Sequence, residues 1–166
     1  MIPESFQLRH ASRPLRLFLT AFLLVLTLGY VFGLSFVHHT TSLSPGGVVE
    51  QFRGNQSPDV SQKELKYEKS LNEMLTFTHN HILSLTLLFF VVGGILLCSS
   101  IISDGWKTFL IVEPFVAIVT TFGGLWLLRF TSPWLVWLVV LSGITMLVCY
   151  LASIYLILKE LWFKKV

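Results

Sequence analysis

Four long apolar segments constrain this chain more than any other feature of its sequence. They cover roughly residues 15–37, 82–102, 108–130 and 134–158. A helix needs about 20 mostly apolar residues to cross the hydrocarbon core of a bilayer, and each segment reaches that length. Of the 166 residues, 54% are hydrophobic and only 13% are charged, which is too apolar for a water-soluble domain. The sequence therefore predicts an all-α fold, an integral membrane bundle of four helices.

The first apolar segment has the basic flank of a signal peptide, because Arg9, Arg13 and Arg16 precede it. Residues 15–37 nevertheless form a longer apolar run than the roughly 7–15 residues of a signal-peptide core, and no small-residue cleavage site follows. We therefore expect a first helix that is retained in the protein.

Basic residues predict the orientation of the bundle. The two ends of the chain are mostly basic, whereas the stretch between the first two apolar segments mixes basic and acidic side chains: Arg53, Lys63, Lys66 and Lys69 with Glu50, Glu64, Glu68 and Glu73. Basic flanks stay on the cytoplasmic side of a membrane. We predict that residues 1–14 and 159–166 are cytoplasmic and that the connection 38–81 is exoplasmic.

Local signals predict structure inside this connection. Ser44 followed by Pro45 is typical of a helix cap and a first-turn proline, which predicts a short helix through about Phe52. The stretch from Ser70 to Glu73 has the spacing of a capping box. The second long helix should therefore begin near residue 71, about two turns before its apolar segment.

Short turns and small residues predict how the helices pack. The sequences SDGW and TSP join the last three segments, so these helices must be antiparallel neighbours. Gly29 and Gly33 form a GxxxG pattern in the first segment, and such patterns allow close approach of helices. We interpret it as a packing seam within the bundle, with a partner-binding face as the alternative.

Four histidines stand where the connection 38–81 meets the first two helices: His38, His39, His79 and His81. Haem takes axial imidazoles from facing helices. At about 100° per residue, His79 and His81 point about 200° apart, and His38 and His39 about 100° apart, so one of each pair can face a shared site. We expect His39 and His81, with His38 and His79 as substitutes, to bind the iron of one haem b.

Two alternatives to haem remain at this stage. Three or four of the histidines could bind a zinc or copper ion, although their spacing matches no specific metal motif. The imidazoles could also be interfacial side chains without any ligand, since amphipathic groups are tolerated at the membrane surface.

Glu113 is the other polar residue of interest, because it lies inside the third apolar segment. A carboxylate there could accept a proton or contact a quinone. The alternative is an ion pair with Arg16 or Lys159, which we favour. No Ser-His-Asp or paired-carboxylate arrangement is visible, so we expect no stand-alone catalytic site.

Three stretches carry a resemblance: SPGGVVEQFRG, EMLTFTHNHILSL and EPFVAIVTTFGGLWLLRFTSPWLVWLVVLSG. Together they resemble a family of small bacterial four-span membrane proteins whose members occur beside cytochromes and other respiratory components. The resemblance covers about residues 38–143 and implies a location in the bacterial inner membrane, but it supplies no catalytic residues.

Two functions follow as hypotheses. The first is a subunit of a respiratory or electron-transfer assembly that binds one haem b near the exoplasmic face, with a quinone as a further candidate partner. The second is a ligand-free accessory or scaffolding subunit that docks a larger membrane complex or a cytochrome.

Overall fold

The computed structural model describes residues 7–55 and 65–163, and within these ranges the chain is helical and has no β-strand. The five α-helices are α1 (Arg13–Thr41), α2 (Pro45–Arg53), α3 (Leu71–Leu97), α4 (Asp104–Phe130) and α5 (Val136–Phe163), with single 3-10 turns η1 (Leu8–His10) and η2 (Pro133–Leu135). Helices α1, α3 and α4 and the stretch from η2 through α5 are each long and apolar enough to cross a membrane. The predicted all-α four-helix membrane bundle is therefore confirmed.

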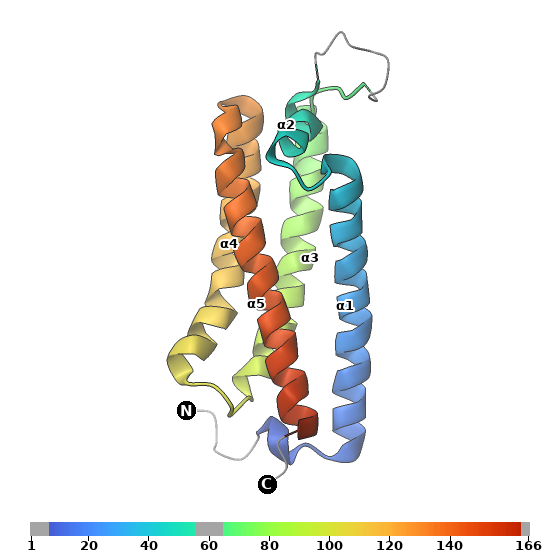
Figure 1. Ribbon diagram of the computed structural model, residues 1–166, viewed down its shortest axis with the longest axis vertical. Coiled ribbons are helices and arrows are strands. Elements are labelled where there is room, and N and C mark those ends of the chain that lie inside the picture. The colour runs from blue at the N-terminus through green and yellow to red at the C-terminus, as the bar shows by residue number, and fades with distance from the viewer. Residues whose placement is uncertain (1–6, 56–64, 164–166) are drawn as a thin grey trace.

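The four long helices run side by side, with the start of α1 and the end of α5 at one end of the bundle and α2 at the other (Figure 1). We call these the terminal end and the α2 end. Helix α4 packs against α5 along its length and also against α3. Gly124 makes the α4–α5 approach close, because a Cβ there would lie 2.9 Å from Val139 Cγ2. The antiparallel neighbours predicted from the short turns are confirmed.

Both predicted caps in the connection are present. Ser44 Oγ accepts a hydrogen bond of 3.0 Å from the Gly47 N–H and begins α2. Ser70 and Glu73 form the reciprocal capping box at the start of α3. Because this cap satisfies two donors of the first turn, α3 begins well before its apolar segment, as expected.

Helix α3 ends at Leu97, five residues before the end of the segment predicted as its span. The helix ends early because the polar residues that follow it bind a carboxylate of α5. Ser99 and Ser100 donate hydrogen bonds from their hydroxyls to the carboxylate of Glu160 in the last turns of α5. The chain leaves the helix to bind this carboxylate.

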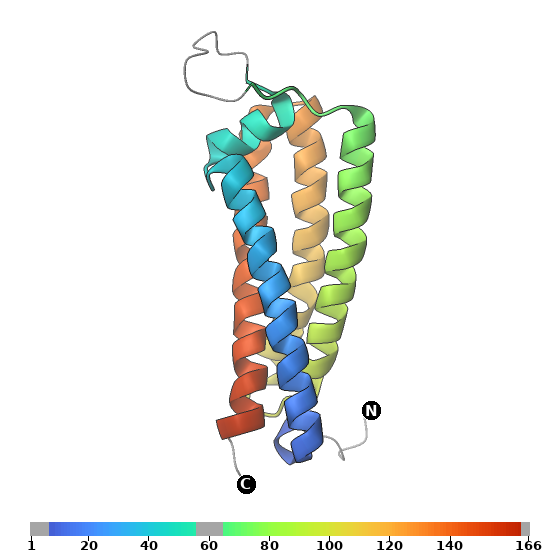
Figure 2. The same ribbon diagram turned by 90° about the vertical axis from the view of Figure 1, so that its right-hand side faces the viewer.

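Helix α1 is anchored on α5 by residues between Thr20 and Tyr30. Thr27 Oγ1 hydrogen-bonds with Tyr150 Oη at 3.0 Å, and the Tyr30 and Tyr150 rings stack with centroids 4.2 Å apart. Trp162 Nε1 donates to Thr20 Oγ1 at 2.9 Å. Toward the α2 end, α1 diverges from α5 in Figure 1 and from α3 in Figure 2.

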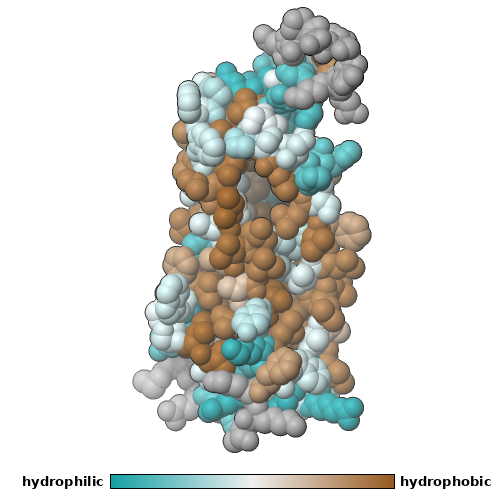
Figure 3. All heavy atoms as spheres, in the orientation of Figure 1, coloured by the Kyte–Doolittle hydropathy of each residue, from teal (hydrophilic) through white to brown (hydrophobic). Residues whose placement is uncertain are grey.

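The surface is suited to lipid. Brown, apolar residues cover the middle of the bundle and teal, polar residues gather at its ends (Figure 3). Many large apolar side chains are exposed, including Phe18, Phe32 and Phe90 at 67%, 68% and 70%. Such a belt belongs in a hydrocarbon environment, where it needs no cover by other protein.

Candidate ligand-binding cavity

The divergence of α1 leaves a cavity of about 1470 Å³ between it and α3, α4 and α5. Helix α2 forms its roof through Val48, Gln51 and Phe52. Figure 3 shows the surface hollowed below this roof, in the upper half of the bundle. Large, mostly apolar cavities with a few polar groups are the usual form of small-molecule sites.

One wall of the cavity carries most of its polar groups. They follow one another along α3 and the residues before it: Lys69, Asn72, Glu73, Thr76, Asn80, His81 and Ser84. Lys69 Nζ and Glu73 Oε1 form an ion pair of 2.9 Å. They are the charged residues that line the cavity, and their charges cancel. This wall therefore offers hydrogen bonds without a net charge.

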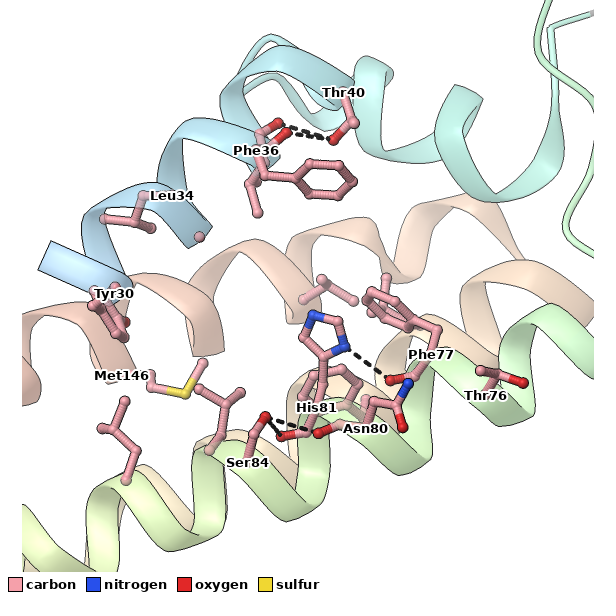
Figure 4. A pocket seen from close by; sticks show the side chains of 18 of the residues that line it. Tyr30, Leu34, Phe36, Thr40, Thr76, Phe77, Asn80, His81, Ser84 and Met146 are labelled. Carbon is pink, nitrogen blue, oxygen red and sulfur yellow. Dashed lines mark hydrogen bonds between the residues drawn. The ribbon is translucent and has the colours of Figure 1, made fainter. Parts of the chain in front are cut away.

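His81 holds a defined position in this wall (Figure 4). Its Nδ1 lies 2.9 Å from the Phe77 carbonyl oxygen, and its ring is 4.2 Å from the Phe77 ring and 5.7 Å from the Phe122 ring. A carbonyl oxygen only accepts hydrogen bonds, so Nδ1 carries the proton. In the neutral imidazole Nε2 is then free to accept a hydrogen bond or to bind a metal ion.

The rest of the cavity is apolar. Leu85, Leu88 and Val91 continue the α3 wall toward the terminal end, and Met146 of α5 lies opposite. Gly29 and Gly33 line the α1 side, and a Cβ at either position would meet nothing within 4 Å. Our interpretation of this GxxxG pattern as a packing seam is therefore wrong: the two glycines face the cavity.

The structure brings one of the four predicted histidines to this cavity. All four histidines are exposed, but His38 and His39 at the end of α1 and His79 on α3 do not line the cavity, whereas His81 does. Over residues 7–55 and 65–163, no group of three or more His, Cys, Asp or Glu side chains is placed to hold a metal ion. Of the four histidines, His81 is therefore the candidate for binding a ligand in this cavity.

Glu113 lies outside the cavity, beside the Cys149 thiol of α5. Its Oε2 is buried without a hydrogen-bond partner. The ion pair that we favoured is not formed, because Arg16 donates instead to the backbone oxygens of Ala11 and Arg9. The other predicted partner, Lys159, lies 5.5 Å from the centre of the Tyr155 ring.

Sequence reasoning missed Glu160, which is fully buried. Its carboxylate accepts from Ser99 Oγ, from Ser100 Oγ at 2.7 Å and from the Ser100 N–H at 3.0 Å. A signal existed: the pair Ser99-Ser100 and Glu160 both lie at the terminal-end boundary of apolar segments. Helices α3 and α5 run in the same direction and contact each other, so both boundaries lie at the terminal end.

Two arginines fix the roof to the bundle. Arg53, the last residue of α2, donates to the Leu128 carbonyl at 2.9 Å. Arg129 of α4 donates to the Lys69 carbonyl at 2.8 Å and lies 3.3 Å from the Glu68 carboxylate. Cations suit the carbonyl-rich C-terminus of a helix. The connection is therefore held against the end of α4, over the cavity.

Fold and cavity together define an integral membrane protein of four long helices, with a ligand-sized space beside its loosely packed first helix. The chain belongs to the Aq_1264_TM family of transmembrane helical domains, which matches residues 42–166. The match begins directly after α1 and spans α2 to α5. No curated protein and no solved structure matches the chain.

Proposed function

We propose that this protein binds a lipid-soluble quinol in the cavity beside α1, as a subunit or partner of an electron-transfer assembly in the bacterial inner membrane. The observation that supports this is the His81 imidazole, whose Nε2 is free at the polar wall of an otherwise apolar cavity. The assembly itself rests on the resemblance to proteins found beside cytochromes. The partner would be such a cytochrome or a larger complex.

The chemistry of the cavity favours a quinol among membrane amphiphiles. A neutral imidazole with its proton on Nδ1 accepts a hydrogen bond at Nε2, and a quinol hydroxyl donates one. The Phe77 and Phe122 rings beside His81 suit a planar ring. The paired charges of Lys69 and Glu73 give an anionic phosphate head no excess cation to bind.

Replacing His81 with Ala should weaken binding of decylubiquinol by about tenfold, because one hydrogen bond of about 1.4 kcal/mol is lost. His79→Ala is the matched control, since His79 lies two residues away on α3 but outside the cavity. Titration of the protein in lipid nanodiscs, followed by tryptophan fluorescence, measures both. Equal affinity of the two variants, or no binding by the parent protein, would contradict the proposal.

One haem b is a second candidate for the ligand of this cavity, and the free Nε2 of His81 favours it as well. An unprotonated Nε2 facing apolar space is what an axial haem ligand needs. His39 and His38 lie outside the cavity, so the second ligand would have to come from another lining residue, and the thioether of Met146 is available. His/Met ligation occurs in cytochromes.

A visible spectrum of the purified protein tests the haem candidate. With haem bound, we expect a Soret band that His81→Ala abolishes and His79→Ala leaves in place. Met146→Leu, which keeps the volume of the side chain, should shift the band if the sulfur is a ligand. A colourless protein that still binds decylubiquinol would contradict the haem candidate and support the quinol proposal.

We also propose that the α2 end is exoplasmic, because the basic residues favour cytoplasmic chain ends. Tyr67, 78% exposed beside α2, and His10, exposed at the terminal end, are suitable reporter positions. In a background without Cys98 and Cys149, an impermeant maleimide should label Tyr67→Cys in spheroplasts. It should label His10→Cys only after permeabilisation. The reverse pattern would overturn the orientation.

A further inference from the structure

The apolar part of the cavity is larger than a quinol ring requires and is open at its side. Helix α1 contacts α2 and α5 but makes little contact with α3 in the described part of the chain. Its anchors on α5, at Thr20, Thr27 and Tyr30, reach from near the terminal end to just past the middle of the helix. Beyond Tyr30, the described residues of α1 make no hydrogen bond or ring contact with α3, α4 or α5.

The α2 end of α1 is nevertheless held in place. Lys66 Nζ donates to the Thr40 carbonyl, and α2 follows after a three-residue turn. Helix α1 is thus anchored as far as Tyr30 and again at Thr40, and stands away from the bundle between these residues. The space left there opens toward the surface that the apolar belt assigns to lipid (Figure 3).

We infer that the ligand carries a long hydrocarbon chain and reaches the cavity sideways from the bilayer, past the part of α1 between Tyr30 and Thr40. Its neutral head stays at the polar wall with His81, and its chain occupies the apolar part between α1 and Met146. This inference rests on the proposed function for the identity of the head group, but not for the chain. The cavity keeps room for the chain because Gly29 and Gly33 project no side chain into it.

The test uses hexadecanol that bears a diazirine in its chain, which has a neutral hydroxyl head and no quinone ring. The full-length protein in liposomes is irradiated with this probe, and the labelled peptides are mapped by mass spectrometry. Met146 is only 8% exposed, so its labelling requires the chain inside the cavity. We expect labelled Met146 in the parent protein. Its absence, with lipid-facing Phe18 labelled, would overturn the inference.

Filling variants make the test specific. The double variant Gly29→Leu/Gly33→Leu should lose the Met146 label severalfold while Phe18 stays labelled. The matched control is Gly94→Leu/Gly143→Leu, since those glycines also have open space around an added Cβ but lie outside the cavity. Undiminished labelling in the first variant would contradict the proposed route. If Met146 is labelled in a protein that binds no decylubiquinol, the quinol proposal is contradicted and the inference about the hydrocarbon chain is supported.

Discussion

Replacing Glu160 with Ala should destabilise the protein by about 2–4 kcal/mol, because the buried Ser99 hydroxyl loses its partner, which costs about 1–3 kcal/mol, and the hydrogen bonds from the exposed Ser100 are lost as well. Three donors from Ser99 and Ser100 converge on this carboxylate, which is fully buried at the terminal end. Loss of the carboxylate leaves the α3–α4 connection without its anchor on α5. Unfolding in mixed micelles with increasing SDS, followed by circular dichroism, measures the loss.

Lys159→Ala is the control for this experiment, since Lys159 is the exposed neighbour of Glu160. It should change the free energy of unfolding by less than about 0.5 kcal/mol. Glu160→Gln should fall between the two, because the amide keeps one acceptor oxygen but turns a donor toward the serines. A Glu160→Ala protein as stable as the Lys159→Ala protein would show that this network contributes little.

Replacing Gly47 with Ala should cost about 2–3 kcal/mol, as expected for overpacking against atoms that cannot move aside. The added Cβ would lie 1.9 Å from the carbonyl oxygen of Thr41. That oxygen belongs to the backbone of the tight turn between α1 and α2, where Ser42 and Leu43 already have φ values of 52° and 50°. The turn must open to accept the methyl group.

Gly46→Ala is the matched control, because the neighbouring position in α2 has nothing within 4 Å of an added Cβ. It should leave stability unchanged or raise it by up to about 1 kcal/mol, since alanine favours helix over glycine. The same SDS titration compares the two. Because α2 roofs the cavity, Gly47→Ala should also weaken decylubiquinol binding, whereas Gly46→Ala should not. Equal stability of the two variants would contradict this account of the turn.

The stability and binding variants separate two roles within the same helices. Glu160 stabilises the terminal end of the bundle and Gly47 the turn at the α2 end, and neither residue lines the cavity. His81 lines the cavity and donates only to the carbonyl of its own helix. Loss of binding in His81→Ala with an unchanged unfolding midpoint would therefore report on the site and not on the fold.

Signals local in the chain determined the architecture. The length of the apolar segments predicted four long helices, since the thickness of a bilayer sets the length of a spanning helix. The cap at Ser44 and the capping box at Ser70 and Glu73 fixed the starts of α2 and α3, because their hydrogen bonds join residues three apart. The short turns required α3, α4 and α5 to be antiparallel neighbours.

Only the tertiary structure decided which of the candidate site residues share a space. Helical spacing showed that His79 and His81 point apart, but the divergence of α1 decided that His81 faces a cavity and that His39 does not. The same divergence turned Gly29 and Gly33 from an expected seam into a cavity wall. Glu160 accepts hydrogen bonds from serines that lie about 60 residues away along the chain. Such choices depend on how whole helices tilt and pack against each other, and the local pattern of one segment does not contain that information.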